Sequence, residues 1–380
     1  MQFDLSKRQT QSLFVFILAL SIALQWYGHA CGLIKTSDSY QYLSAAQSFK
    51  TNGNFLSPDG SYYTYWPPLF PVILSVFDSP ESALIWIHVV AKVSIGLLIY
   101  FIANEFLEKN IFKVLFFVAT LCSVQITMIS VFVWSELIFL LLLLLTVYCA
   151  LKMKASQLHF IGLLVFSFLM CLQRNAGAFF IPAIGLWIVL DTTSKNEERI
   201  VRSTAVCISG LAGLFLWNIY ISYFIPSNFY FYRHEFFVDY ALNFSTLSTL
   251  LIKFFIPRSE IFATFLGLVL LLAVVVLTVK GNFHNRHVQL VGLLILFYWM
   301  GLMSMARLDI YETDRYLSVI LHFVYLLFFF LIEIGFKRVN AARQLAMVVV
   351  LLLWMIYPVS RAIKNTHIWN EKSCSAYPAK

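Results

Sequence analysis

The sequence predicts an all-α polytopic membrane protein. Of its 380 residues, 60% are hydrophobic and only 12% are charged, whereas soluble domains average about 25% charged residues. One soluble core cannot bury so much apolar surface, so lipid must solvate much of the chain. Runs of roughly twenty apolar residues recur along the sequence, and this is the length with which an α-helix crosses a bilayer.

These runs predict about eleven transmembrane helices within one integral membrane domain, residues 1–380. The expected spans are 12–32, 83–104, 112–129, 131–151, 157–173, 176–191, 203–225, 260–280, 289–306, 317–336 and 344–360. The first run is too long for the core of a signal peptide, and it lacks an A-x-A cleavage site. We therefore interpret it as a retained span.

Charges between the spans predict the orientation. If the N-terminus is cytoplasmic, every inner loop is basic, as the positive-inside rule requires. The outer side then holds a first loop at 33–82, a second long loop at 226–259 and a tail at 361–380, together with most of the acidic residues. We expect a multi-pass protein of the plasma (inner) membrane with an extracytoplasmic active site.

The net charge of +8 does not indicate a nucleic-acid partner. The Lys and Arg residues are scattered over short loops rather than gathered on one soluble face, which suits contact with membrane lipids. The six cysteines lack metal-ligand spacing, and we expect no cofactor and no obligatory metal. Cys31 and Cys374 would both lie outside, so a disulfide between them is one option.

The first outer loop contains the most informative pattern. Apolar side chains recur there at three- and four-residue spacing, at Tyr42, Ala45, Ala46 and Phe49. This spacing predicts an amphipathic helix at about 39–50, lying along the membrane surface. Asp38 precedes it, either as its N-cap with Gln41 as capping-box partner or as a functional carboxylate.

An aromatic segment follows this helix. Its members are Tyr63, Tyr65 and Trp66, followed by Pro67 and Pro68. Aromatic rings beside a carboxylate suit a sugar, but the same rings are typical of an interfacial belt. The second long outer loop is also aromatic-rich and is expected to contain an amphipathic region.

Together, Asp38-x-x-x-Tyr42, the short helix and Tyr65-x-Pro67-Pro68 resemble the first outer loop of the GT-C membrane glycosyltransferases. This superfamily includes the protein O-mannosyltransferases and the lipid A aminoarabinose transferases. The resemblance implies a polyprenyl-phosphate sugar donor, inversion at the anomeric carbon and Asp38 as the base for the acceptor. It also implies a substrate-binding role for Tyr42 and for the aromatic and Pro-Pro segment.

Two positions differ from the superfamily pattern. An Asp-Glu pair is frequent where this chain has Asp38-Ser39. The aminoarabinose branch often has a Lys, which serves a donor phosphate, where this chain has Trp66.

Other charged residues at the outer ends of spans have two interpretations each. Glu136 either favours a helix N-terminus by its charge or acts as a second acid of the site. Arg174 either reaches the outer interface or binds an anionic group. Arg315, followed by Tyr316, either pairs with Glu312 and Asp314 or binds a donor phosphate, for which its planar fork of donors is suited. Arg258 in the second long loop is a further phosphate-binding candidate.

The sequence therefore predicts a glycosyltransferase that moves a sugar from a lipid phosphate to an acceptor hydroxyl. The acceptor is a lipid, a glycan or a protein. Two alternatives remain open: a lipid or sugar transporter or flippase, and an O-antigen-type polymerase or ligase. A transporter would be expected to have interrupted spans in matching halves, and a polymerase or ligase a large late outer loop.

Overall fold

A computed structural model of the chain describes residues 4–226, 239–256, 262–281, 286–304, 308 and 310–376. Within these ranges the chain forms helices joined by short connections, with two isolated β-bridges. The helices are α1 (Lys7–Gly28), α2 (Ser37–Asn52), α3 (Leu69–Ser75), α4 (Pro80–Phe106), α5 (Asn110–Leu121), α6 (Val124–Val131), α7 (Glu136–Lys152), α8 (Gln157–Gln173), α9 (Gly177–Val189), α10 (Asn196–Phe224), α11 (Tyr240–Lys253), α12 (Ala263–Gly281), α13 (Arg286–Ser304), α14 (Ile310–Leu317), α15 (Leu321–Phe336) and α16 (Ala341–Ala376).

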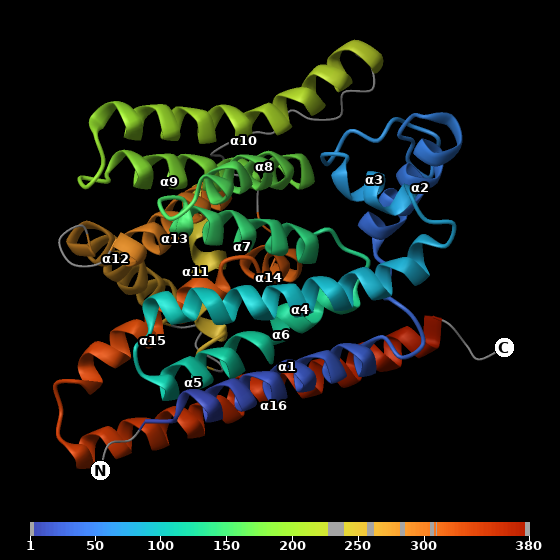
Figure 1. Ribbon diagram of the computed structural model, residues 1–380. Helices are drawn as coiled ribbons and strands as arrows, with labels where there is room; N and C mark the ends of the chain where they lie inside the picture. The colour runs from blue at the N-terminus through green and yellow to red at the C-terminus, as the bar shows by residue number, and fades with distance from the viewer. Residues whose placement is uncertain are drawn as a thin grey trace.

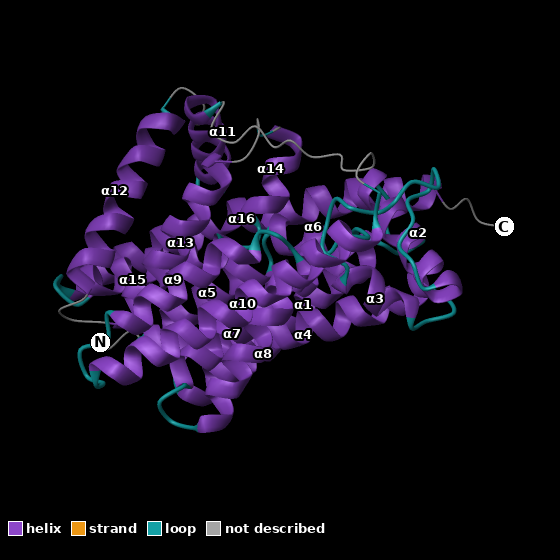
Figure 2. Ribbon diagram, turned by 90° about the horizontal axis from the view of Figure 1, so that it is seen from above, coloured by secondary structure: helices purple, strands orange, loops and turns teal. Residues whose placement is uncertain are grey.

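The long helices lie side by side as a bundle. α1 and α16 pack along one side, α8, α9 and α10 along the opposite side, and α4 and α7 between them (Figure 1). α2 and α3 gather at one end of the bundle (Figure 2). The first outer loop is therefore placed as a cap on the ends of the long helices.

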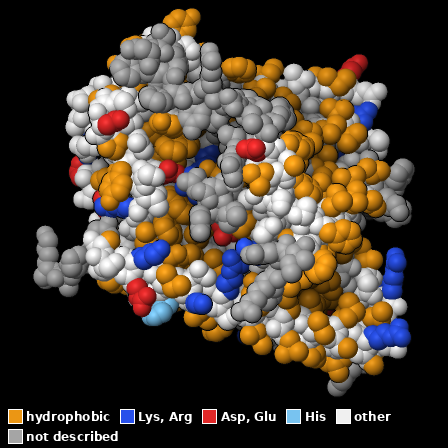
Figure 3. Space-filling view, turned by 180° about the vertical axis from the view of Figure 1, so that it is seen from behind, with side chains coloured by type: hydrophobic (Ala, Val, Ile, Leu, Met, Phe, Trp, Pro, Cys, Tyr) orange, Lys and Arg blue, Asp and Glu red, His pale blue; other side chains and the backbone are white. Residues whose placement is uncertain are grey.

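The surface and the helix lengths are those of an integral multi-pass membrane protein. α1, α4, α10, α13 and α16 are long and apolar enough to cross a membrane. Hydrophobic side chains cover much of the face in Figure 3, and charged ones stand there in small groups. Large apolar residues such as Phe215 on α10 and Ile356 on α16 are more than half exposed, which only lipid makes favourable.

The predicted spans correspond to helices, with corrections at three places. The span expected at 112–129 is broken: α5 and α6 meet at a bend of 42°. Ser123 is the N-cap of α6, because its Oγ accepts a hydrogen bond from the Ile126 N–H (3.2 Å). Five helices, or six with this bent pair, meet the length and hydropathy criterion, so the count of eleven is not established.

The span expected at 131–151 becomes helical only at Glu136, because the residues before it pair with the first outer loop. The helix expected at 344–360 instead continues to Ala376, so the predicted tail is helical up to that residue.

A disulfide links Cys31, just after α1, to Cys374 near the end of α16, with the two Cα atoms 4.9 Å apart. This bond confirms the option that the sequence left open. Tyr27 Oη and His367 Nδ1 (2.8 Å) add a second tie between the same helices. The disulfide restrains the chain seven positions before Asp38.

Alkylation of the denatured protein tests the disulfide. The other four cysteines, Cys122, Cys149, Cys171 and Cys207, are free thiols. We expect four maleimide adducts per chain without a reductant and six after reduction, counted by intact-mass spectrometry. Replacing both Cys31 and Cys374 with Ser should also lower thermal stability, since loss of such a bond typically costs about 2–5 kcal/mol. Six adducts without reductant would contradict the bond.

Candidate active site

Two distant segments are joined by backbone hydrogen bonds in front of α2 and α7. The Ile34 N–H donates to the Val131 carbonyl (3.0 Å), and the Val133 N–H donates to the Ile34 carbonyl (2.9 Å). Ser39 Oγ extends the contact by donating to the Val133 carbonyl (3.0 Å). This pairing holds the first turn of α2 against the start of α7, and so brings Asp38 and Glu136 to one place.

Asp38 is not the N-cap of its helix. Thr36 takes that position, and its N–H donates to Ser39 Oγ (2.9 Å). The expected capping box with Gln41 is therefore wrong, and the Asp38 carboxylate is released for other contacts. The helix ends at Gly53, whose φ of 71° is the left-handed conformation that glycine adopts without strain.

Four charged side chains meet at this point: Asp38, Glu136, Arg174 and Arg315. We call them the acid–arginine cluster. Arg315 Nη2 lies 2.5 Å from Asp38 Oδ2, and Arg315 Nε lies 3.2 Å from Glu136 Oε1. Arg174 Nη1 lies 2.7 Å from the same Glu136 oxygen. The sequence nominated all four residues, and the structure brings them together.

The cluster is buried and formally neutral. The exposed side-chain fraction is 13% for Asp38, 6% for Arg315 and 2% for Glu136. Two carboxylates balance two guanidinium groups, which is how buried charges are usually tolerated. Both Glu136 oxygens and Arg315 Nε nevertheless lack a well-directed hydrogen bond within the described residues. The Glu136 contacts are therefore ion pairs by distance alone, and polar atoms of the cluster still have unused hydrogen-bonding capacity.

Electrostatics keep Arg315 charged in this buried place. Burial acts to lower the pKa of Arg315, but the opposing charges, of Glu136 above all and also of Asp38, outweigh it and raise the pKa. Burial also acts to lower the pKa of Arg174, but the combined effects of Glu136, Tyr42 and Tyr316 raise it. Two cations therefore stand in the cluster, Arg315 beside Asp38 and Arg174 beside Glu136.

Ser135, which the sequence did not nominate as a site residue, connects the cluster to its surroundings. Arg174 Nη1 donates to Ser135 Oγ (2.8 Å), and Tyr42 Oη lies 3.2 Å from the same oxygen. Gln173 Nε2 also donates to the Ser135 carbonyl (3.1 Å). Its position directly before Glu136 was the only signal in the sequence.

Aromatic rings cover the two arginines. The Arg315 guanidinium lies 5.1 Å from the ring centre of Trp134 and 5.2 Å from that of Tyr316, and Arg174 lies 5.9 Å from Tyr316. These distances are within cation–π range. Tyr298 Oη holds the Tyr316 backbone by donating to its carbonyl (2.9 Å). Tyr316 thus contacts both arginines through its ring. Trp134 and Tyr298 also belong to the site, although the sequence did not nominate them.

The nominated aromatic residues of the first loop pack against one another, and Tyr42 connects them to the cluster. Tyr42 reaches it through Ser135 and packs on Trp66, with 5.2 Å between ring centres. Tyr63 is fully buried beside both rings, and its hydroxyl has no hydrogen-bond partner among the described residues. Tyr65 packs on Trp66 (5.4 Å).

Pro67 and Pro68 act through the backbone. They end the aromatic segment, and Pro68 is the N-cap residue of α3. The pair therefore sets where α3 begins.

Arg315 lies on α14. Asn243 of α11 holds the segment that precedes α14 in the chain. Asn243 Oδ1 accepts a hydrogen bond from the Leu308 N–H (2.9 Å), and Asn243 Nδ2 donates to the Met303 carbonyl (3.3 Å). Asp314, one of the expected ion-pair partners of Arg315, forms no ion pair with it.

Three further predictions fall on residues that the structure does not describe. Arg258 lies outside the described residues, as do residues 227–238 and 257–259 of the predicted second long loop and the side chain of Glu312. Within the described ranges, no group of three or more His, Cys, Asp or Glu side chains is arranged to hold a metal ion.

Comparison with known proteins finds no matching family model and no matching curated protein. Solved structures do match. ArnT from Cupriavidus metallidurans bound to undecaprenyl phosphate aligns with a TM-score of 0.60 at 9% identity, over 96% of this chain and 75% of that one. The apo oligosaccharyltransferase of Archaeoglobus fulgidus aligns with a TM-score of 0.57 at 12% identity, over 97% of this chain and 56% of that one. Since both are GT-C enzymes, the chain has the GT-C membrane glycosyltransferase fold.

Proposed function

We propose that the protein transfers a sugar from a polyprenyl-phosphate-linked donor to an acceptor hydroxyl at the outer membrane face. The observation that carries the proposal is the acid–arginine cluster, in which two buried arginines pair with Asp38 and Glu136 within a GT-C fold. The similar ArnT structure contains undecaprenyl phosphate, which supports a donor of that class.

In the proposed reaction Asp38 is the general base. Its carboxylate accepts the proton of the acceptor hydroxyl while the oxygen attacks the anomeric carbon. The bond from that carbon to the phosphate oxygen breaks, and the polyprenyl phosphate leaves as an anion that needs no proton. A single carboxylate is therefore sufficient, and attack opposite to the leaving group inverts the anomeric carbon.

The arginines would bind the donor phosphate and stabilise the charge that grows on it. Arg315 is bound to Asp38 Oδ2 in the present structure. A donor phosphate competes for this guanidinium and so releases Asp38 to act as a base. Glu136 positions both arginines, because one of its oxygens lies near each of them. Tyr42, Tyr63, Tyr65 and Trp66 would hold the sugar and acceptor beside these groups.

An assay of the purified full-length protein with a radiolabelled polyprenyl-phosphate sugar tests the proposal. We expect the label to move to a lipid, glycan or peptide acceptor, with release of one free polyprenyl phosphate for each sugar transferred. Movement of intact donor across proteoliposome membranes without bond cleavage would instead identify a transporter. Extension of a lipid-linked glycan chain in place of transfer to a separate acceptor would identify a polymerase.

A further inference from the structure

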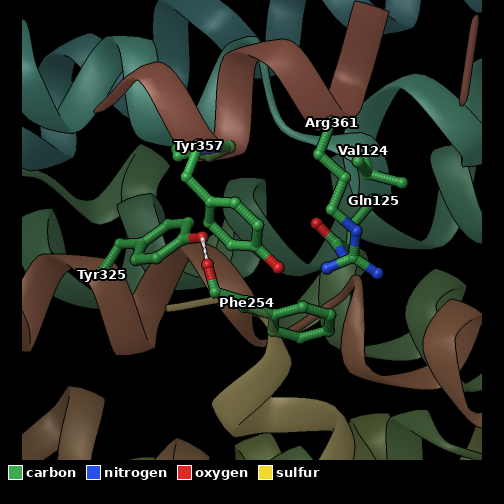
Figure 4. Close-up of a pocket in the computed structure, with 7 residues that line it drawn as sticks. Val124, Gln125, Phe254, Tyr325, Tyr357 and Arg361 are labelled. Atoms are coloured by element: carbon green, nitrogen blue, oxygen red, sulfur yellow. Dashed lines mark hydrogen bonds between the residues drawn. The ribbon is translucent and has the colours of Figure 1, made fainter. Parts of the chain in front are cut away.

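A small recess lies outside the acid–arginine cluster, where α6, α15 and α16 meet the end of α11. Polar side chains of Gln125, Tyr357 and Arg361 stand on one side of it, and Phe254, Tyr325 and Pro358 supply aromatic and apolar walls (Figure 4). The recess has room for about one water-sized group. It shares no lining residue with the cluster.

The Gln125 amide and the Arg361 guanidinium both line the recess. Gln125 is only 3% exposed, and its Nε2 has no partner in the described part of the chain. Such a buried amide is costly unless something accepts its hydrogen bond. Figure 4 shows the Arg361 guanidinium beside the Gln125 amide. No carboxylate is found among the described residues that line the recess.

One nitrogen of the Arg361 guanidinium is hydrogen-bonded to the backbone. Its Nη1 donates to the Lys253 carbonyl (3.0 Å), which also accepts from Tyr357 Oη (2.8 Å). The guanidinium group has five N–H donors, so the anchoring bond leaves others for a ligand. Among the described residues, the basic side chains of Arg361 and Lys253 both interact electrostatically with Asp314.

An aromatic wall continues from the recess along α15 and α16. Phe255 stacks on Trp354 with ring centres 5.9 Å apart, and Tyr325 and Phe328 pack against both rings. Further along α16, Leu353 and Ile356 are more than half exposed. A molecule with an anionic group at one end and an apolar chain would accept hydrogen bonds from the donors and pack against this wall.

We propose that the recess binds the phosphate group of an anionic membrane lipid, with one phosphate oxygen between Gln125 and Arg361 and the lipid chain along the α15–α16 wall. A phosphate oxygen matches the size of the recess and accepts hydrogen bonds from both donors. Basic pockets between transmembrane helices are a recurring way of binding lipid headgroups. This site would be a second lipid-phosphate site, separate from the proposed donor site.

Native mass spectrometry of the purified full-length protein tests the proposal, because it counts bound lipids. The probes are phosphatidylglycerol, polyprenyl phosphate, the zwitterionic phosphatidylcholine and inorganic phosphate. The wild type should bind one more phosphatidylglycerol or polyprenyl phosphate than either Gln125→Leu or Arg361→Gln. Each substitution should weaken that step by about tenfold, the effect of losing one charge-assisted hydrogen bond. Arg343→Gln removes an exposed charge near the start of the same helix and should match the wild type.

Equal lipid counts in the wild type and both recess variants would overturn the proposal. Equal binding of phosphatidylcholine would also overturn it, as would displacement of the lipid by inorganic phosphate at the same concentration. The measurement reads binding rather than transfer, so its outcome is independent of the proposed enzymatic function. Gln125→Leu preserves the size of a neutral side chain and keeps the test valid if Arg361→Gln fails to fold.

Discussion

Replacing Asp38 with Asn should abolish most sugar transfer while the protein still folds. The amide has nearly the same shape, and its oxygen still accepts a hydrogen bond from Arg315, which now lies 2.5 Å from the carboxylate. It cannot accept the acceptor's proton, however, and general-base catalysis typically contributes about 10²–10⁴-fold to the rate. We therefore expect kcat to fall by about that factor in the radiolabelled-donor assay, with little change in donor binding.

Asp59→Asn is the matched control for this substitution. Asp59 lies in the same outer loop but is exposed, and its Oδ1 accepts hydrogen bonds within a local turn from the Ser61 N–H and Oγ. It should keep wild-type transfer. If purified Asp38→Asn retained most of the rate, Asp38 would not be the base, whatever the remainder of the site does.

Replacing Arg315 with Gln should impair both stability and transfer. The substitution leaves Asp38 without its cation and removes one of the two arginines near Glu136. Breaking a buried ion pair from one side typically costs about 3–5 kcal/mol, because the remaining charge is uncompensated. Thermal unfolding should therefore begin at a lower temperature. Transfer should fall by about 10²–10³-fold, the usual effect of removing one donor that stabilises a developing negative charge.

The double variant Asp38→Asn with Arg315→Gln separates the two effects. Removing both charges of a buried pair is far less damaging to stability than removing one, so the double variant should unfold at a higher temperature than Arg315→Gln. Transfer should remain lost, because the base is absent. A double variant no more stable than Arg315→Gln alone would show that the Asp38–Arg315 contact is not what stabilises this end of the bundle.

The membrane architecture was predictable because the bilayer imposes a single strong requirement. Backbone groups in lipid must be satisfied within helices, so helices appear wherever apolar runs are long enough. The errors occurred where a side chain or a neighbouring segment competed with the helix. Ser123 restarts the helix in the run at 112–129, and pairing with Ile34 delays the start of α7 to Glu136.

The candidate site was predictable as a set of residues but not as a geometry. Asp38 was nominated from the aromatic residues around it and from the resemblance to the GT-C first loop, and Glu136, Arg174 and Arg315 from charges at the expected outer ends of spans. Their sequence separations are too large for any local rule to pair them. The pairing of Asp38 with Arg315 spans 277 positions, whereas the only ion-pair partners that the sequence suggested for Arg315 were its near neighbours Glu312 and Asp314.

The sequence by itself determined that this chain is a membrane protein. It also determined the approximate positions of the helices and the polar residues that interrupt the apolar pattern. These features follow from the sequence because hydrophobic burial and helix formation depend on residue type and short-range spacing. Only the tertiary structure decided which of those polar residues meet. Backbone pairing of Ile34 with Val131 and Val133 brings two acids together, and α8 and α14 supply the two arginines that neutralise them. Charge pairing in a buried place depends on distances of a few ångströms, and only the packed bundle specifies these.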